Sequence, residues 1–377
     1  MAFAMAQPPS AGPMGEPAAR QPPAALVDTE HTDMIYDIQL DYYGKRLATC
    51  SADRTFRIFD VSGATSSSAS SVSPANPESD GAPSPNYTLQ HVVRVVEDSA
   101  APLHRVAWAH PKYGSVVALA AQDGKVYIYR EELAAQQQHQ PGVPVGPGAA
   151  TEWRLKHVHN FHADAVLSVA WAPYEYGLCL ASASADNRVS FLARAREGWV
   201  TTSSFINSED GAACTAVSWA PYNAPGSQGA AGPIQRVVTG SSNHVVKIWQ
   251  FAPGENHWVP ATDANGADVA SLFGHNDWVR DVAWAPNVGI PANVIASASD
   301  DHTVRAWSQD EPNGEWKSHV VHTFRSPVYR ISWSLTAAVL SVASGDDEVT
   351  FWKARSEQEW VQIASVTDAG ALPSAES

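Results

Sequence analysis

Residues 297–307 read Ser-Ala-Ser-Asp-Asp-His-Thr-Val-Arg-Ala-Trp, and this segment decides the fold. Asp301 lies in its polar turn, and Trp307, six residues later, ends a stretch that alternates polar and apolar residues. The same offset of six residues recurs at five other places in the chain. The pairs are Asp53 with Phe59, Asp123 with Tyr129, Asp186 with Leu192, Asn243 with Trp249, and Asp346 with Trp352. One spacing held at six places indicates an internal repeat.

The tryptophans follow the same repeat. One group closes an alternating segment that precedes each of the last five turns, as in Val-Arg-Asp-Val-Ala-Trp at residues 279–284. Another group opens a segment after the turn, as Trp360 does. Period-2 alternation bounded by Gly, Asn, Asp and Pro is typical of strands. Four strands per unit, repeated six times, predict an all-β fold, a six-bladed β-propeller of WD repeats. The first group is Trp108, Trp171, Trp219, Trp284 and Trp333, and the second is Trp153, Trp199, Trp258, Trp316 and Trp360.

The composition sets the expected domain organisation. We expect the propeller to span residues 26–366, between an N-terminal tail at residues 1–25 and a C-terminal tail at residues 367–377. Residues 62–85 are rich in Ser and Pro, and residues 131–150 are rich in Gln, Pro and Gly. Neither stretch has the apolar periodicity that burying a core requires, so both are predicted to be disordered loops.

The predicted ring has no closing strand. Many propellers close by adding an N-terminal strand to the last blade, but here the last repeat has its own fourth strand beginning at Trp360. The segment before Met34 offers only Leu26 and Val27 as strand residues. The sequence therefore predicts an open ring, which leaves unpaired strand edges and two hydrophobic blade faces beside one another.

Charge and cysteine content narrow the class of protein. The chain has 24 Lys and Arg against 39 Asp and Glu, a net charge of −15, which disfavours binding to nucleic acid or directly to anionic lipid. Its three cysteines have no CxxC spacing and favour a reducing compartment. No apolar run is long enough for a membrane span, and residues 1–25 contain no signal-peptide core.

Five segments resemble one known family. They are Asp-Tyr-Tyr-Gly-Lys-Arg-Leu-Ala-Thr-Cys-Ser at residues 41–51, Trp-Ala-His-Pro-Lys-Tyr-Gly at 108–114, Trp-Ala-Pro-Tyr-Glu-Tyr-Gly at 171–177, Asp-Trp-Val-Arg-Asp-Val-Ala-Trp at 277–284, and Val-Thr-Phe-Trp-Lys at 349–353. Together they resemble the Sec-thirteen family of WD-repeat propellers over about residues 30–366. The departures are the insertion at residues 62–85, the Gln-rich loop and the extended N-terminus.

The resemblance implies a non-enzymatic scaffold whose open ring is completed by a blade inserted from a partner. The implied partners are the large cage subunit of the COPII coat and a nucleoporin of the Y complex, with an amino-acid signalling complex at the vacuole as a third. Membership implies roles in endoplasmic reticulum to Golgi transport and mRNA transport. It also implies a cytoplasmic protein, peripheral on the endoplasmic reticulum membrane and COPII vesicles, and present at the nuclear pore. The alternative is a closed WD-repeat adaptor that reads peptides, such as a ubiquitin-ligase substrate receptor.

Candidate chemical groups have a structural explanation. In WD repeats a turn His, the loop Asp, a strand Ser and the third-strand Trp form a hydrogen-bond set, here His275, Asp301 and Trp307 with Ser297 or Ser299. The other aspartates expected in such sets are Asp53, Asp123, Asp186 and Asp346. His157, His159 and His162 are close in sequence, but they have no Cys or acidic residue at ligand spacing, so ordinary strand histidines are favoured over zinc. We expect no catalytic residue, metal or cofactor.

The predicted open slot lies between the first and last blades. The expected contacts with an inserted blade come from the first strand of each. On blade 1 they are Met34, Ile35 and Ile38, and on blade 6 they are Val328, Ile331 and Trp333.

Overall fold

The structure is a computed structural model. It describes residues 27–62, 86–95, 101–134, 150–229, 232–252, 254–255, 257–262, 269–288, 292–311, 314–356, 359–367 and 370–372.

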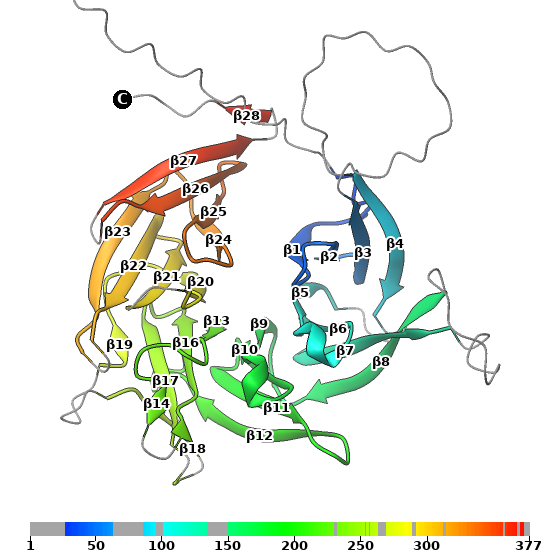
Figure 1. Cartoon of the computed structure of the whole chain (residues 1–377), viewed down its shortest axis with the longest axis horizontal. Coiled ribbons are helices and arrows are strands. Elements are labelled where there is room, and N and C mark those ends of the chain that lie inside the picture. Colours follow the sequence, from blue (N-terminus) through cyan, green and yellow to red (C-terminus); the bar gives the residue numbers. More distant parts are fainter. Residues whose placement is uncertain are drawn as a thin grey trace, which may run out of the picture.

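Six antiparallel sheets form the blades of a β-propeller, each with four main strands in the order of the chain from the channel outward, and two of the sheets have a short fifth strand. Figure 1 shows them arranged radially, with blade 1 in blue and blade 6 in orange and red at the two ends of the ring. Blade 1 contains β1 (Ile35–Leu40), β2 (Arg46–Ser51), β3 (Thr55–Ser62) and β4 (Asn86–Arg94). Blade 2 contains β5 (Leu103–Trp108), β6 (Val116–Ala121), β7 (Lys125–Leu133) and β8 (Thr151–Asn160). Blade 3 contains β9 (Val166–Trp171), β10 (Cys179–Ser184), β11 (Arg188–Arg194) and β12 (Trp199–Ile206).

The second half of the chain repeats this plan. Blade 4 contains β13 (Cys214–Trp219), β16 (Arg236–Ser241), β17 (Val246–Ala252) and β18 (His257–Pro260), and β19 (Ser271–Leu272) also pairs with β17. Blade 5 contains β20 (Val279–Trp284), β21 (Asn293–Ser299), β22 (Thr303–Gln309) and β23 (Lys317–Thr323). Blade 6 contains β24 (Val328–Trp333), β25 (Leu340–Ser344), β26 (Glu348–Ala354) and β27 (Trp360–Thr367). A small hairpin of β14 (Gln228–Gly229) and β15 (Gly232–Pro233) and two 3-10 turns (Pro111–Tyr113 and Tyr174–Tyr176) lie in connections.

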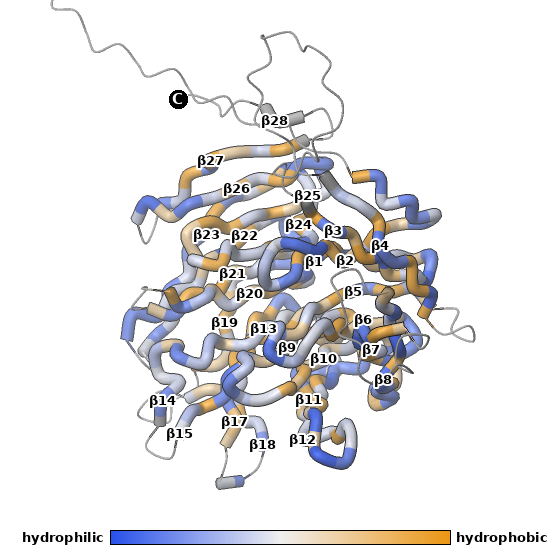
Figure 2. The backbone as a smooth tube through the Cα atoms, turned by 45° about the vertical axis from the view of Figure 1, so that its right-hand side comes forward, coloured by the Kyte–Doolittle hydropathy of each residue, from blue (hydrophilic) through white to orange (hydrophobic). Residues whose placement is uncertain are grey.

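The repeated turn has one backbone conformation. The residue after each repeat Asp or Asn has a positive φ, between 57° and 76°, which is the left-handed conformation that tight hairpin turns require. Five of these residues are not glycine, so the hydrogen bonds of the preceding side chain must stabilise the turn. In Figure 2 hydrophilic turns alternate with hydrophobic strand segments along the chain. The residues are Arg54, Gly124, Asn187, His244, His302 and Asp347.

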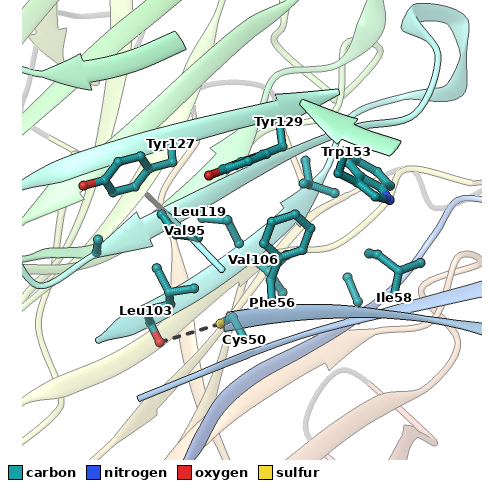
Figure 3. Close-up of a cluster of buried hydrophobic side chains, with 13 residues drawn as sticks. Cys50, Phe56, Ile58, Val95, Leu103, Val106, Leu119, Tyr127, Tyr129 and Trp153 are labelled. Carbon is teal, nitrogen blue, oxygen red and sulfur yellow. Dashed lines mark hydrogen bonds between the residues drawn. The ribbon is translucent and has the colours of Figure 1, made fainter. Parts of the chain in front are cut away.

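The hydrophobic core is divided into separate clusters, one at each boundary between successive blades from 1 to 6. At the first boundary Phe56 of blade 1 packs between Tyr129 and Trp153 of blade 2 (Figure 3), with ring centroids 5.1 and 5.9 Å away. In the same view the Cys50 thiol donates to the Leu103 carbonyl oxygen. Five clusters therefore join six blades in series.

No such cluster joins blade 6 to blade 1 among the described residues. Strand pairing identifies equivalent positions on the face that each blade turns toward the next. In blade 5 these positions are Ala296, Ala298, Val304 and Ala306, and all are buried. In blade 6 they are Ser341, Ala343, Val349 and Phe351, none of which is fully buried, and Val349 is 37% exposed. The ring is therefore open between these two blades, as Figure 1 shows.

The predicted fold class is confirmed: the described chain is an all-β, six-bladed propeller in which each blade has four strands. Most of both predicted loops and the tail at residues 1–25 lie outside the described residues. At the edges the structure differs from the prediction. β3 includes Ser62, and β7 continues through Glu131 to Leu133 because these residues pair with β8. Residues 370–372, within the predicted C-terminal tail, form β28 (Gly370–Leu372), which pairs with β27.

Candidate partner-binding slot

Blade 5 contains a continuous hydrogen-bond chain behind its repeat turn. His275 Nδ1 lies 2.9 Å from Asp301 Oδ2, and His275 Nε2 lies 2.7 Å from Ser297 Oγ. Trp307 Nε1 donates to the same Ser297 oxygen at 2.8 Å. Because the carboxylate can only accept, His275 Nδ1 is the donor to Asp301, and the neutral ring would accept from the Ser297 hydroxyl through Nε2. Of the two serines left open by the sequence, Ser297 completes this chain, and Ser299 instead donates to the Asp277 carbonyl.

The same arrangement varies from blade to blade. In blade 3, His162 contacts Asp186 at 3.1 Å and Ser182 at 2.9 Å, and Leu192 replaces the tryptophan. In blade 1, His31 contacts Asp53 at 2.8 Å and Thr49 at 2.7 Å. Each aspartate accepts hydrogen bonds within its own blade, so the set does not converge on one pocket.

Two repeat aspartates accept hydrogen bonds from hydroxyl groups. Asp123 accepts from the Tyr127 hydroxyl at 2.7 Å. Asp346 is exposed and accepts from the Ser326 hydroxyl. The repeat offset therefore places every aspartate in the turn, but the hydrogen-bond set around it is complete only in some blades.

Hydrogen bonding dominates the ionisation of these carboxylates. Burial alone would raise the pKa of Asp53, but hydrogen bonds from Thr55 and His31 outweigh burial and lower it to about 2. The same balance lowers the pKa of Asp301, to which His275, Thr303 and the Asn276 amide donate. Both groups are therefore ionised at neutral pH and act as fixed acceptors.

The closely spaced histidines have separate surroundings. His159 Nε2 is 2.9 Å from Ser190 Oγ, and its ring stacks on Phe161. Burial, and then the charges of His162 and His157, lower the pKa of His159 to about 4. Within the described residues, no group of three or more His, Cys, Asp or Glu is placed to hold a metal ion.

The slot between blades 1 and 6 has apolar residues on both sides. On blade 1, Met34 is 63% exposed, and Ile38 and Leu40 are each about half exposed. Ile38 pairs with Thr49, so the two side chains lie on the same face of the blade. Thr49 contacts His31, so this face is turned away from blade 2. On blade 6 the facing residues are Val349, Phe351 and their neighbours on β25. The first strands of the ring also line a central cavity of about 1340 Å³.

The residues predicted to contact an inserted blade separate into two groups. Met34, Ile35 and Ile38 border the slot on blade 1. The prediction for blade 6 is wrong for Val328 and Ile331, which are buried in the cluster shared with blade 5. Trp333 packs against the same cluster, and its indole donates to the Ala283 carbonyl at 3.1 Å. These first-strand positions face the preceding blade, as Val279 and Val282 do in blade 5, so in blade 6 they face blade 5 and not the slot.

A tryptophan repeated on the first strands marks the boundaries that are filled within the chain. At four of the five filled boundaries its indole donates to a first-strand carbonyl of the preceding blade, at 3.0 to 3.1 Å. In blade 1 the equivalent residue is Leu40, as its pairing with Leu47 shows. The first blade therefore lacks the side chain that would bind a preceding blade of this chain. The donors are Trp108, Trp171, Trp219 and Trp333.

Comparison with known proteins places this ring in a family. The model of the WD domain, G-beta repeat, matches residues 25–60 and 266–308. The chain is 34% identical to Protein transport protein SEC13 of Mycosarcoma maydis, over 90% of this chain and 94% of that protein. It is 37% identical to the SEC13 of Emericella nidulans, over 91% of this chain and 98% of that protein. The chain belongs to the SEC13 family.

The similar proteins include one from an animal, and the names of the fungal ones refer to protein transport. The Protein SEC13 homolog of Drosophila melanogaster is 34% identical over 89% of this chain and 82% of its own length. SEC13 relatives are protein-transport proteins by name, which supports a protein-transport scaffold role for this chain. In the described part of the chain no helix is long and apolar enough to cross a membrane.

Proposed function

We propose that this chain is a non-enzymatic scaffold of the COPII coat cage, in which the large cage subunit inserts a seventh blade between blades 6 and 1. We propose that the same slot accepts a nucleoporin of the Y complex and a subunit of an amino-acid signalling complex at the vacuole. One slot binds one blade, so these partners exclude one another. The protein reaches the endoplasmic reticulum membrane, COPII vesicles and the nuclear pore through them.

The observation that carries this proposal is that no sixth inter-blade cluster is found among the described residues. Elsewhere the face that a blade turns toward the next is buried, whereas Val349 and Phe351 of blade 6 face an open slot. Leu40 replaces the tryptophan that would donate to a preceding blade. Apolar surface of this kind favours a partner in proportion to the area removed from water.

The chemistry of the slot favours a strand-forming partner. An inserted sheet would place apolar side chains against Ile38 on one side and Val349 on the other. Because it joins two blade faces at once, we expect the interface to exceed the roughly 1,600 Å² of a standard complex and to be strongly apolar. Its affinity would come from burial and its orientation from strand geometry, as in β-augmentation.

A pair of matched variants tests the slot. Val349→Asp places a charge on the slot face, and Val200→Asp places one on an outer strand at similar exposure, 45% against 37%. Neither side chain is buried in the free chain, so neither variant should lower its stability by more than about 0.5 kcal/mol. With the COPII cage subunit co-expressed, Val349→Asp should lose co-purification and Val200→Asp should retain it.

The result also separates the proposed partners. When the cage subunit and the Y-complex nucleoporin compete for the purified chain, binding of one should exclude binding of the other. Retained binding by Val349→Asp, or simultaneous binding of both partners, would show that the slot is not the binding site.

A further inference from the structure

A cluster of four charged residues crosses the channel. One position on each first strand, just after its register shift, points toward the ring centre. It holds Asp37 in blade 1, Arg105 in blade 2, Asp281 in blade 5 and Arg330 in blade 6. The equivalent residues of blades 3 and 4 are Ser168 and Ala216. The charges therefore lie only in the four blades nearest the opening. We call these four residues the hub cluster.

The hub cluster connects blades that do not share a core. Arg105 Nη2 lies 2.8 Å from Asp281 Oδ1, which joins blade 2 to blade 5 across the channel. Arg330 Nε lies 3.7 Å from Asp37 Oδ1, and its Nη2 donates to the Tyr36 carbonyl at 3.4 Å. Among the described residues, Arg330 makes both polar contacts that link blade 6 to blade 1, one ion pair and one hydrogen bond.

The backbone holds the carboxylates in place. Asp37 Oδ2 accepts from the Val106 amide at 3.1 Å, and Asp281 Oδ2 accepts from the Ile331 amide at 3.2 Å. The first bond ties blade 1 to blade 2 and the second ties blade 5 to blade 6. Each aspartate therefore bridges a filled boundary and also contacts an arginine from a third blade, Asp37 that of blade 6 and Asp281 that of blade 2. Arg330 has a second bond, to the His104 carbonyl at 3.3 Å, which extends its reach to blade 2.

Burial makes the pairing costly to break. Burial lowers the pKa of Arg330, and it raises the pKa of Asp37 despite two nearby arginines. The pKa of Arg105 is raised, because Asp281 and Asp37 outweigh the effect of its burial. Two positive and two negative charges cancel, so the cluster is neutral only while all four members are together. Arg330 is 32% exposed and Asp37 is 13% exposed, so removing either leaves a partly buried charge without its counterpart, which is unfavourable.

We propose that Arg330 and Asp37 form a latch that fixes the width of the slot before a partner blade arrives. The latch joins the two ends of the open ring at the channel, where the described residues form no apolar cluster between them. It leaves the outer strands of blades 1 and 6 apart and free to receive a sheet. Its effect on partner binding rests on the proposed function, whereas its effect on the free ring does not.

Pulsed-EPR distances on the free full-length chain test the latch without any partner. Spin labels at Val92→Cys on β4 and Val361→Cys on β27 lie on the two sides of the slot, with Cys179 replaced by Ala because it is partly accessible. We expect a single narrow distance distribution for this chain. Arg330→Gln should broaden the distribution and move it to a different mean distance.

The matched control is Arg280→Gln, which removes a surface pair with Asp300 in blade 5 and leaves the hub cluster intact. It should leave the distribution unchanged. Should Arg330→Gln fail to fold, Asp37→Asn removes the charge and keeps an acceptor for the Val106 amide. An unchanged distribution in a folded latch variant would overturn the proposal.

Partner binding provides a separate readout. With the COPII cage subunit, Arg330→Gln should bind at least tenfold more weakly than Arg280→Gln, mainly through slower association. Equal affinity of the two variants would refute the effect on binding. Failure of the unmodified chain to bind the subunit would instead refute the proposed function and leave the distance measurement valid.

Discussion

Replacing Asp301 with Ala tests the hydrogen-bond chain of blade 5 most directly. The substitution removes the acceptor for the buried His275 ring, for the Thr303 amide and hydroxyl, and for the Asn276 amide. The Asp301 carboxylate is only 5% exposed, so water cannot fully replace it. A buried donor left unsatisfied costs about 1–3 kcal/mol, and the exposed Asn276 amide can turn to water. We therefore expect a loss of about 3 kcal/mol in the free energy of unfolding.

Urea unfolding of the variant and of a matched control measures this loss. Asp346→Ala removes an aspartate at the same repeat position in blade 6, but that side chain is exposed and accepts only from Ser326 among the described contacts. The control should change the free energy of unfolding by less than about 0.5 kcal/mol. Equal losses in the two variants would refute the idea that the turn aspartate is stabilising because its donors are buried.

The pH dependence gives an independent check on Asp301. Its pKa is lowered in the folded chain, so the stabilisation is present above the unfolded pKa of about 4 and is lost as the pH falls further. The difference in stability between the parent chain and Asp301→Ala should therefore be constant from pH 5 to 7 and shrink below about pH 4. A constant difference at all pH values would contradict the assignment.

Three further predictions follow from other parts of the chain. Replacing residues 63–85 with a short Gly-Ser linker should leave the free energy of unfolding and partner binding nearly unchanged. Ser62 and Asn86 are already paired, and loop closure costs only about 0.6 kcal/mol per doubling of loop length. A large loss in either measurement would show that this insertion is needed. Because the pKa of His159 is lowered to about 4, the free energy of unfolding should fall as the pH drops from about 6.5 toward 4. In urea unfolding, His159→Gln should reduce this dependence of stability on pH. An equal dependence in the variant would exclude His159 as its source. With a net charge of −15, the purified chain should bind neither DNA nor RNA in filter assays at low salt; micromolar binding that weakens steeply with salt would contradict this.

The repeated offset predicted most of the fold. The spacing from Asp301 to Trp307 located a turn and a third strand, and its recurrence gave the number of blades. The separate fourth strand beginning at Trp360 predicted that blade 6 is complete within the chain. These features could be predicted because they depend on neighbouring residues and on strand periodicity.

The residues that border the slot were harder to predict. The equivalent first-strand positions of both blades face the preceding blade, so Val328 and Ile331 face blade 5 whereas Ile35 and Ile38 face the slot. The sequence did contain a signal for blade 1: five first strands end in Trp and one ends in Leu40. The pairing of Arg330 with Asp37 could not be predicted, since it joins positions 293 residues apart through the ring as a whole.

The serial arrangement of the five core clusters has a consequence for cooperativity. In the described part of the chain each of the four inner blades is stabilised on two sides, whereas blades 1 and 6 have one core neighbour each. A linear array of this kind behaves like a one-dimensional lattice, in which the end units open first and the inner units follow. The free chain is thus physically closer to a repeat solenoid than to a closed ring. An inserted blade would remove both ends at once, so that opening any one blade would require breaking two boundaries.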